Sequence, residues 1–481
     1  LNIDALKGLS PPEQEYLERM MTFVYREQLA QKVGTQEGQG GAIANLWNMP
    51  LTEKRDTGSI FYGLRILHKE LSSNYSGYDR LVFSIPDMGD DFLPNFRRND
   101  AVCLYGYDSE PSVCHAIIYK GVIEQLSDHT ITVRLNEGQQ NPEVFEDTTY
   151  ALEPSFTDRG TTAAIRSLQA FCAASPERRA LLLGEREPRC DKSLQLSRSY
   201  HPHYDAFLLK AKQARDYFVL QGPPGTGKTS MALRFLVEEE LQSAHDQEST
   251  AGILLMSYTN RAVDEICGML EEAGIAYLRI GSETSCDPRF AHRLLDHVVE
   301  ERPRMDGIRQ YIIDTKVIVC TTSTMQSRPY LFQLKHFSLC IVDEASQLLE
   351  PHLIGLLASP QIDRFILIGD HKQLPAVVQQ PDDIPALTTC RQSLFERLMH
   401  LERKAQRSAF TATLQRQGRM HPDIAAFPNK MFYAEEHLQP VPLPHQEEER
   451  LEYLQPSEDA LDDVLKQRRV IFLPSDATDA R

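Results

Sequence analysis

The sequence carries no excess of basic residues: its 51 Lys and Arg are outnumbered by 68 Asp and Glu, and the formal net charge is −17. This balance argues against a polyanion-binding surface spread over the whole molecule, because such surfaces are usually basic. It leaves room for a narrow groove of locally positive sign, with acidic residues elsewhere limiting non-specific contacts. Part of the acidic excess lies between residues 447 and 463, where a solvated loop is expected.

Paired cysteines and long apolar runs are also missing. The nine cysteines include no Cys-x-x-Cys pair, which argues against a zinc or iron–sulfur site and predicts buried free thiols in a reducing compartment. No run approaches the ~18 apolar residues of a membrane span, and no signal peptide is visible. These features predict a soluble, cytoplasmic protein. The first residue is Leu, so we expect the natural N-terminus to lie upstream.

The N-terminal third of the chain changes its apolar period. Helical periodicity predicts one helix over Pro11–Val33 and another over Thr161–Ala174. Between them lie short strands separated by turn residues, over 101–105, 112–119, 121–126 and 130–135. Such strands favour a small closed barrel, which is as often a passive packing module as a nucleic-acid clamp. At 481 residues, the chain should form two to four domains.

The most informative stretch begins at Tyr217, where an apolar strand enters a glycine-rich turn and then a helical pattern from Met231 to Glu240. This is the context in which Gly-x-x-x-x-Gly-Lys-Thr forms a phosphate-binding loop. Backbone N–H groups then face phosphate oxygens, Lys228 reaches the outer phosphates and the Thr229 hydroxyl holds Mg²⁺. The candidate residues for binding a nucleoside triphosphate are Gly222, Pro223, Pro224, Gly225, Thr226, Gly227, Lys228, Thr229 and Ser230.

Two further strands end in residues suited to triphosphate hydrolysis. The apolar strand Phe337–Val342 runs into Asp343 and Glu344, and a carboxylate at the end of a buried parallel strand lies beside the phosphate loop. Asp343 is expected to complete the Mg²⁺ shell, and Glu344 to orient or deprotonate the attacking water. Taken alone, Asp-Glu after a strand is equally often a favourable helix start. A strand over 365–368 leads to Gln373, a candidate sensor of the γ-phosphate.

Short polar side chains follow two other apolar strands. Thr259 and Asn260 follow one of them, and Thr322 and Ser323 follow the other. Uncharged donors suit contacts to sugar-phosphate oxygens that must be released in every cycle, since a row of Lys or Arg would bind too tightly. The same residues could simply cap the helices that follow, and both interpretations can hold together.

These blocks resemble the motifs of superfamily 1 helicases, specifically the 5′-to-3′ branch that includes the nonsense-mediated-decay RNA helicase and the nuclease-helicase of Okazaki-fragment maturation. The similar blocks span 221–230, 257–264, 320–324, 343–347, 369–375 and 414–422. The last is similar to the arginine-bearing motif at the junction of the two motor domains. By this resemblance, Arg419 stabilises charge on the γ-phosphate of ATP, whereas alone it would be an ordinary surface arginine.

The chain departs from the family pattern at two positions. Where the family carries an adenine-reading glutamine, about eighteen residues before the first glycine of the loop, this sequence has Tyr204. Where the family carries a base-stacking tyrosine before its junction arginine, this sequence has Gly418. We expect Tyr204 to supply the stacking surface, worth about 1 kcal/mol, and base discrimination to be relaxed.

The resemblance implies an α/β fold: a RecA-like phosphate-loop domain with a parallel sheet, preceded by a helical stalk and a small β-barrel accessory domain. We expect a stalk region over 1–95, the barrel over 96–155, and a stalk helix with linker over 156–200. The first motor domain would cover 201–440, with a helical insertion at 270–315. Residues 441–481 would be a linker and the start of a truncated second motor domain, with a strand from Arg469, so these residues alone should hydrolyse ATP weakly.

The expected function is ATP-dependent 5′-to-3′ movement along single-stranded nucleic acid. DNA is favoured and RNA is the alternative, because the motif set does not separate them. A second hypothesis is an ATP-gated binding module without unwinding activity. Other phosphate-loop enzymes, such as small-molecule kinases or ring ATPases, lack the Thr-Asn and Gln-Gly-Arg-Met-His-Pro blocks. No membrane partner is expected, and the parent protein could carry an N-terminal nuclease or other domain.

Overall fold

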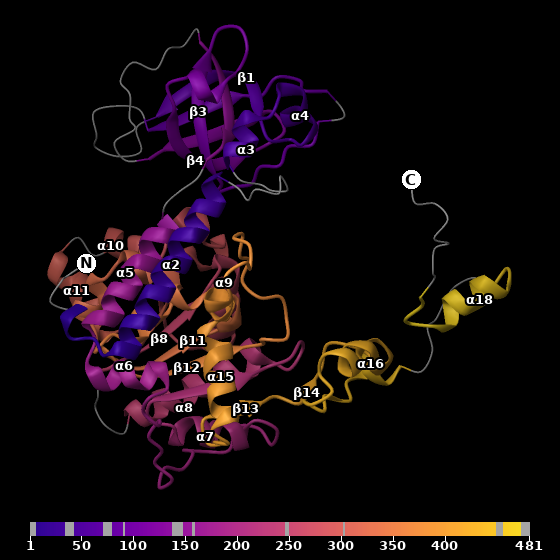
Figure 1. Cartoon of the computed structure of the whole chain (residues 1–481). Helices are drawn as coiled ribbons and strands as arrows, with labels where there is room; N and C mark the ends of the chain where they lie inside the picture. The colour runs from indigo at the N-terminus through magenta and orange to yellow at the C-terminus, as the bar shows by residue number, and fades with distance from the viewer. Residues whose placement is uncertain are drawn as a thin grey trace. The chain divides into compact units, whose positions relative to one another are not determined.

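A computed structural model of the chain (Figure 1) describes residues 6–33, 43–70, 79–89, 92–136, 148–155, 159–245, 250–301, 304–448 and 456–472. The chain divides into two compact units. One, the motor unit, comprises Leu1–Leu9, Gln169–Ala376 and Gln392–Arg481; the other, the barrel unit, comprises Ser10–Leu168 and Val377–Arg391. The second unit therefore takes a short segment from the middle of the chain in addition to the N-terminal region.

The motor unit is built on a seven-stranded sheet in the order β13-β7-β12-β11-β8-β10-β9, in which all neighbouring strands are parallel. The strands are β7 (Tyr217–Gln221), β8 (Gly252–Ser257), β9 (Leu278–Arg279), β10 (Val317–Thr321), β11 (Phe337–Val342), β12 (Ile362–Gly369) and β13 (Thr411–Thr413). Central strands such as β7, β8 and β10 are buried at every position, as expected of near-continuous apolar runs covered on both faces. The predicted α/β fold with a parallel sheet is confirmed.

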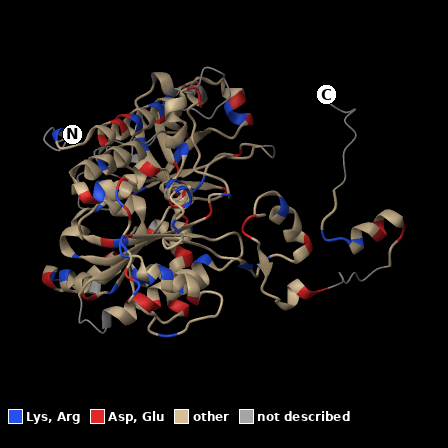
Figure 2. Ribbon diagram, turned by 60° about the horizontal axis from the view of Figure 1, so that its bottom comes forward, with Lys and Arg blue, Asp and Glu red and all other residues tan. Residues whose placement is uncertain are grey.

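Helices alternate with these strands. They are α6 (Pro176–Leu183), α7 (Asp205–Gln213), α8 (Arg234–His245), α9 (Asn260–Glu272), α10 (Leu295–Glu301), α11 (Met305–Asp314), α12 (Thr322–Ser327), α13 (Tyr330–Leu334), α14 (Ile354–Leu357), α15 (Leu394–Lys404), α16 (Pro422–Met431), α17 (Pro444–Glu447) and α18 (Ala460–Gln467). The helix predicted from Met231 starts earlier, as a π-helical turn over Lys228–Leu233 that continues into α8. Figure 2 shows acidic and basic residues interspersed along the ribbon of these elements.

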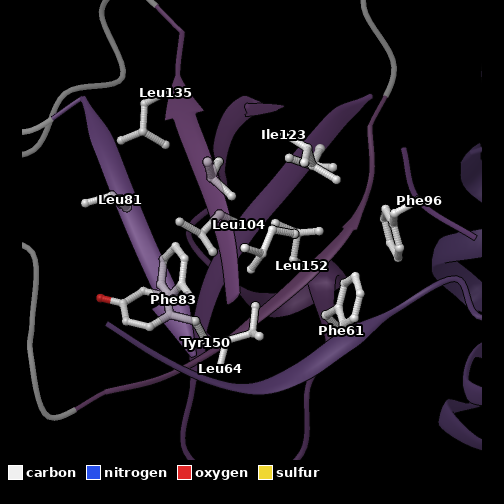
Figure 3. Packing of buried hydrophobic residues seen from close by; sticks show 13 residues of the cluster. Phe61, Leu64, Leu81, Phe83, Phe96, Leu104, Ile123, Leu135, Tyr150 and Leu152 are labelled. Carbon is white, nitrogen blue, oxygen red and sulfur yellow. The ribbon is translucent and has the colours of Figure 1, made fainter. Parts of the chain in front are cut away.

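The barrel unit contains a closed six-stranded barrel, ordered β1-β2-β5-β4-β3-β6, as the sequence predicted. Its strands are β1 (Phe61–Glu70), β2 (Arg80–Ser84), β3 (Ala101–Tyr107), β4 (Tyr119–Leu126), β5 (Thr130–Leu135) and β6 (Thr149–Pro154). Inward-facing side chains fill it, and Figure 3 shows Leu81, Phe83, Leu104 and Leu152 converging on one core. All six neighbouring pairs of barrel strands are antiparallel, and successive residues along each strand face opposite sides of the barrel wall.

Two details of the predicted barrel differ. The barrel takes β1 and β2 from the region before residue 96, where the prediction placed only stalk residues. In the C-terminal half of β1, polar residues outnumber apolar ones, so the sequence there shows no clear alternation of apolar and polar residues. The strand predicted over Ser112–Tyr119 is wrong, because Val113–His115 forms a 3-10 turn and β4 starts only at Tyr119.

Helices complete the barrel unit. α2 covers Pro11–Val33 as predicted, α5 covers Arg159–Ala173, and α3 (Ile43–Asn48) and α4 (Leu51–Asp56) precede the barrel. The segment from Val377 to Arg391 is held on α2: the Glu27 carboxylate accepts hydrogen bonds from the backbone N–H groups of Gln379 and Gln380, at 2.9 and 3.1 Å. This segment begins four residues after Gln373 in the chain.

The remaining predictions concern cysteines, membrane spans and the C-terminal strand. All nine cysteines are free, but Cys114 and Cys190 are exposed and not buried as predicted. None of the helices in the described ranges is long and apolar enough to cross a bilayer. The strand predicted from Arg469 is absent as far as Phe472, and the rest of that segment lies outside the described residues.

Candidate functional site

The glycine-rich turn after β7 adopts the conformation that its sequence requires. Gly225 and Gly227 have φ angles of 76° and 75°, in the left-handed region that side chains disfavour. At Gly222 an added Cβ would lie 2.2 Å from Cγ of Lys228, so the lysine side chain runs directly over this glycine. The Gly222 N–H donates to the Gly369 carbonyl at 2.9 Å, which joins the turn to the end of β12.

Residues from β7 and β11 meet at the carboxyl edge of the sheet. The Thr229 hydroxyl donates to Oδ2 of Asp343 at 2.6 Å, and Lys228 Nζ lies 3.5 Å from Oε1 of Glu344. Glu344 has a φ of 53°, a strained conformation for a residue with a side chain, of the kind that clusters at functional sites. The structure thus brings together four of the six residues that the sequence placed in triphosphate hydrolysis, namely Lys228, Thr229, Asp343 and Glu344.

Asp343 is almost fully buried, with 2% of its surface exposed. Burial raises its pKa to about 6, and the nearby charge of Glu344 adds to the effect, while the hydrogen bond from Thr229 and the charge of Lys228 oppose it. A bound cation would reverse this penalty, because positive charge favours the ionised carboxylate. Hydroxyl and carboxylate oxygens are ligands that Mg²⁺ accepts together with phosphate oxygens, so Thr229 and Asp343 fit the predicted metal role.

The loop after β12 is organised around Asp370, which is 1% exposed. Its Oδ2 accepts hydrogen bonds from Nε2 of Gln373 at 2.8 Å and from the Tyr433 hydroxyl at 2.7 Å. Its Oδ1 accepts from the backbone N–H of Lys372 at 3.1 Å and from the side-chain amide of Gln221. The candidate sensor Gln373 is therefore held at its amide nitrogen.

Arg419 lies against the phosphate loop. The preceding Gly418 donates its N–H to the Gly225 carbonyl at 2.9 Å, and an added Cβ on Gly225 would come within 2.5 Å of Cβ of Arg419. Gln417 fixes the turn, because its Oε1 accepts from the backbone N–H of Arg419 at 3.1 Å. The backbone of the candidate arginine is thus next to the site where phosphates are expected.

Tyr204 lies behind the phosphate loop. It is 8% exposed, and its hydroxyl donates to the Thr226 carbonyl at 2.9 Å. Its ring makes edge contacts with His201, Phe207 and Phe235. A pocket of about 380 Å³ opens beside it, lined by His203, Tyr204, Thr226, Thr413, Leu414, Gln415, Arg416, His437 and Gln439.

Arg416 and His437 line this pocket, although they are not among the site residues predicted from the sequence. Gln415 and Arg416 belong to the junction block over 414–422, and their position a few residues before Arg419 is the sequence signal that points to them. His437 carries no signal of its own, although its φ of 53° marks a tight turn in the structure.

The residues predicted to contact nucleic acid lie just after the ends of β8 and β10, which are neighbours in the sheet. Thr259 caps α9, because its hydroxyl accepts from the Ala262 N–H at 3.1 Å, and Asn260 is the first residue of that helix. Thr259, Asn260 and Ser323 are exposed, whereas Thr322 is buried at 3%. The capping interpretation holds for Thr259, and the exposed residues remain available to a ligand.

Tyr258 is a further exposed group in this region, with 53% of its surface accessible. It directly precedes Thr259 and belongs to the block over 257–264. In the described ranges, no group of three or more His, Cys, Asp or Glu side chains is placed to hold a metal ion.

Two family models, both described as an AAA domain, match the motor region. The first matches residues 203–307 and 301–381, and the second matches residues 390–476. The boundary between them falls between the loop that carries Gln373 and the block that carries Arg419.

Curated relatives align over much of the chain. The "DNA replication ATP-dependent helicase/nuclease" of Bos taurus is 27% identical over 413 residues, which are 81% of this chain and 36% of the relative. Its counterpart in Arabidopsis thaliana is 27% identical over 371 residues, 72% of this chain and 26% of the relative. That of Mus musculus is 32% identical over 222 residues, 46% of this chain and 19% of the relative.

The aligned region is thus about a third or less of the length of these relatives. The first family model covers the phosphate loop, the carboxylates after β11 and the sensor loop after β12, which lie at one edge of a single parallel sheet. The motif order, the α/β fold and these matches agree: the chain belongs to the superfamily 1 helicases, in the 5′-to-3′ branch.

Proposed function

We propose that this chain provides the ATP-hydrolysing part of a 5′-to-3′ helicase or translocase that moves on single-stranded DNA. The observation that carries the proposal is the cluster at the edge of the sheet, where Thr229 meets Asp343 at 2.6 Å and Lys228 meets Glu344 at 3.5 Å. The exposed residues that follow β8 (Thr259 and Asn260) and β10 (Ser323) lie at the ends of strands one and two positions beyond β11 in the same sheet.

Each group in the cluster has a proposed role in ATP hydrolysis. Lys228 contacts the outer phosphates, and Thr229 and Asp343 hold Mg²⁺, which would neutralise charge on the phosphate oxygens. Glu344 orients the attacking water and accepts its proton. Lys228 and Glu344 face each other in the structure, so ATP phosphates would draw the lysine away and leave the carboxylate to the water.

Two further residues act on the γ-phosphate in this proposal. Gln373 contacts the phosphate or the attacking water with the part of its amide that Asp370 does not hold. Arg419 directs its guanidinium to the charge that develops in the transition state, from a backbone position that already adjoins Gly225.

The base and ribose of ATP would occupy the pocket beside Tyr204, which extends from Thr226 of the loop to Arg416 and His437. Tyr204 would contribute its ring to the pocket wall and its hydroxyl to the support of the loop. The donors and acceptors of Gln415 and Gln439 could contact several bases, which agrees with the expected relaxed base discrimination.

Tyr204 can be tested by paired substitutions. We expect Tyr204→Phe to raise KM for ATP about two- to fivefold, because the Thr226 carbonyl loses a partner worth ~1 kcal/mol. Tyr204→Ala should raise KM further, about tenfold, since the ring is also lost. Phe207→Leu, a change in a buried neighbour that makes no hydrogen bond to the loop, serves as the control for repacking. An unchanged KM in both Tyr204 variants would remove this residue from the nucleotide site.

DNA is the proposed strand because the relatives are named for DNA replication. Those names also include a nuclease, but we propose no nuclease site within the described residues, where no metal-binding cluster of His, Cys, Asp or Glu is found. The nine free thiols favour a reducing compartment inside the cell.

The proposal is tested by the ATP hydrolysis rate of the full-length protein with single-stranded DNA, with RNA of the same sequence, and with neither. A motor on DNA should be stimulated at least about tenfold by DNA and less by RNA, since strand binding completes the catalytic arrangement. Stronger stimulation by RNA than by DNA would show that the protein acts on RNA. A rate that neither polymer changes would contradict the motor and leave an ATP-binding module.

A further inference from the structure

Asp370 connects the candidate γ-phosphate sensor to a distant part of the chain. Its Oδ2 is shared by Gln373 Nε2 at 2.8 Å and by the Tyr433 hydroxyl at 2.7 Å. Gln373 stands three residues after Asp370, whereas Tyr433 stands 63 residues after it, beyond α16. One buried carboxylate oxygen therefore receives a donor from the sensor loop and a donor from the segment that follows the arginine-bearing block.

A second contact links the same two segments. Lys372 Nζ lies 2.6 Å from Oε1 of Glu436, and the Glu436 side chain is 2% exposed. Tyr433 is itself 5% exposed, so both contacts are shielded from water. Charge-assisted contacts that are shielded from water are stronger than exposed ones. The two contacts therefore stabilise the packing of the sensor loop against the segment that follows α16.

The chemistry of the shared oxygen fixes the direction of each bond. Burial, with the added effect of the Asp370 hydrogen bond, raises the pKa of Tyr433 above its ordinary value, so the hydroxyl stays protonated and donates. An ionised carboxylate only accepts, so Gln373 must present its amide nitrogen to Asp370. Its amide oxygen and second N–H then face away from Asp370 and are free to contact phosphate or water.

We propose that Tyr433 is a positioning residue for ATP hydrolysis, which sets the orientation of Gln373 through Asp370. This inference rests on the proposed function and extends it. When Gln373 responds to the γ-phosphate, the shared carboxylate transmits the change to Tyr433 and to the segment between α16 and α17. The contact thus couples the state of the nucleotide to the part of the chain that carries Arg419 and leads onward from the first motor domain.

The test is a double-mutant cycle in the full-length protein, with ATP hydrolysis measured at saturating single-stranded DNA. Tyr433→Phe should lower kcat about tenfold and leave KM for ATP within about twofold, because Gln373 still binds but is misoriented. In a Gln373→Ala background, the same Tyr433→Phe change should lower kcat by less than about twofold, because its target is gone.

The matched control is Tyr217→Phe, which removes another buried tyrosine hydroxyl from another buried carboxylate, Glu402, in the same unit. Its melting temperature should fall as much as that of Tyr433→Phe while its kcat stays near that of the wild type. Equal kcat values for the two variants, or effects of Tyr433→Phe and Gln373→Ala that multiply, would overturn the inference. A wild-type protein that DNA does not stimulate would instead overturn the proposed function, which the cycle presupposes.

Discussion

The Glu344→Gln protein is expected to bind ATP about as tightly as the wild type and to hydrolyse it about 10³-fold more slowly. General-base catalysis by a positioned carboxylate contributes roughly 10² to 10⁴ in rate, and the amide cannot accept the proton. Affinity should not fall, because Glu344 pairs with Lys228 at 3.5 Å in the structure and so competes with the phosphates for the lysine. A slight gain in affinity for ATP would be the more direct sign that Glu344 competes with the phosphates for Lys228.

Single-turnover hydrolysis and equilibrium binding of a fluorescent ATP analogue, both with saturating single-stranded DNA, separate these two effects. Glu283→Gln is a suitable control, since it makes the same change on a side chain that is 74% exposed and distant in sequence from the cluster. A Glu344→Gln protein that keeps more than about a tenth of the wild-type hydrolysis rate would show that another group activates the water.

The Asp343→Asn protein is expected to be more stable than the wild type and yet inactive. Asparagine can keep both observed contacts, since its oxygen can accept from the Glu344 N–H and its amide can meet the Thr229 hydroxyl. The substitution removes a buried carboxylate, and burial raises the pKa of that carboxyl group to about 6. We expect the melting temperature at pH 8 without nucleotide to rise by about 2 to 6 °C. ATP hydrolysis should fall at least about 10²-fold, because Mg²⁺ loses its carboxylate.

The pH dependence gives the sign of this effect. The folded-state pKa of Asp343 lies above its ordinary value, so its contribution to stability is full at low pH and is lost as pH rises through about 6. The advantage of Asp343→Asn should therefore shrink as pH falls from 8 toward 5. Melting curves of both proteins across this range check the trend, and an advantage that grows on acidification would contradict it.

Asp216 offers an opposite control in the same unit. Burial alone would raise its pKa, but hydrogen bonds from Arg189 and Arg186 lower it to about 2. Its carboxylate thus adds stability that is present at neutral pH and lost as pH falls toward that value. Asp216→Asn should lower the melting temperature at pH 8, which distinguishes loss of a stabilising charge from relief of a destabilising one.

The phosphate loop and the sheet could be predicted because their signals are local. β11 spans Phe337–Val342 as predicted, since an unbroken apolar run that ends in charged residues predicts a buried parallel strand. The glycines of the loop follow from the left-handed backbone that the turn requires. In the barrel, β1 was not predicted because apolar and polar residues alternate only weakly in its C-terminal half. Pairing with β2 and β6 compensates for this weak local pattern.

The contact between Tyr433 and Asp370 could not be predicted in the same way. It joins residues 63 positions apart, and nothing in either local pattern specifies the pairing. Tyr204 is an intermediate case: counting back from Gly222 located it beside the phosphate loop, but its hydroxyl bond to Thr226 depends on how α7 packs. Helix packing of this kind is decided by the whole core, so the sequence indicated the residue and not its contact.

We propose that ATP binding and the binding of single-stranded DNA are coupled in this protein, and coupling between two ligands is reciprocal. The most direct test is the affinity of the full-length Glu344→Gln protein for a labelled single-stranded DNA, measured by anisotropy without nucleotide, with ADP and with ATP. We expect dissociation constants for DNA that differ at least about tenfold between nucleotide states. The same dissociation constant in all three states would contradict it.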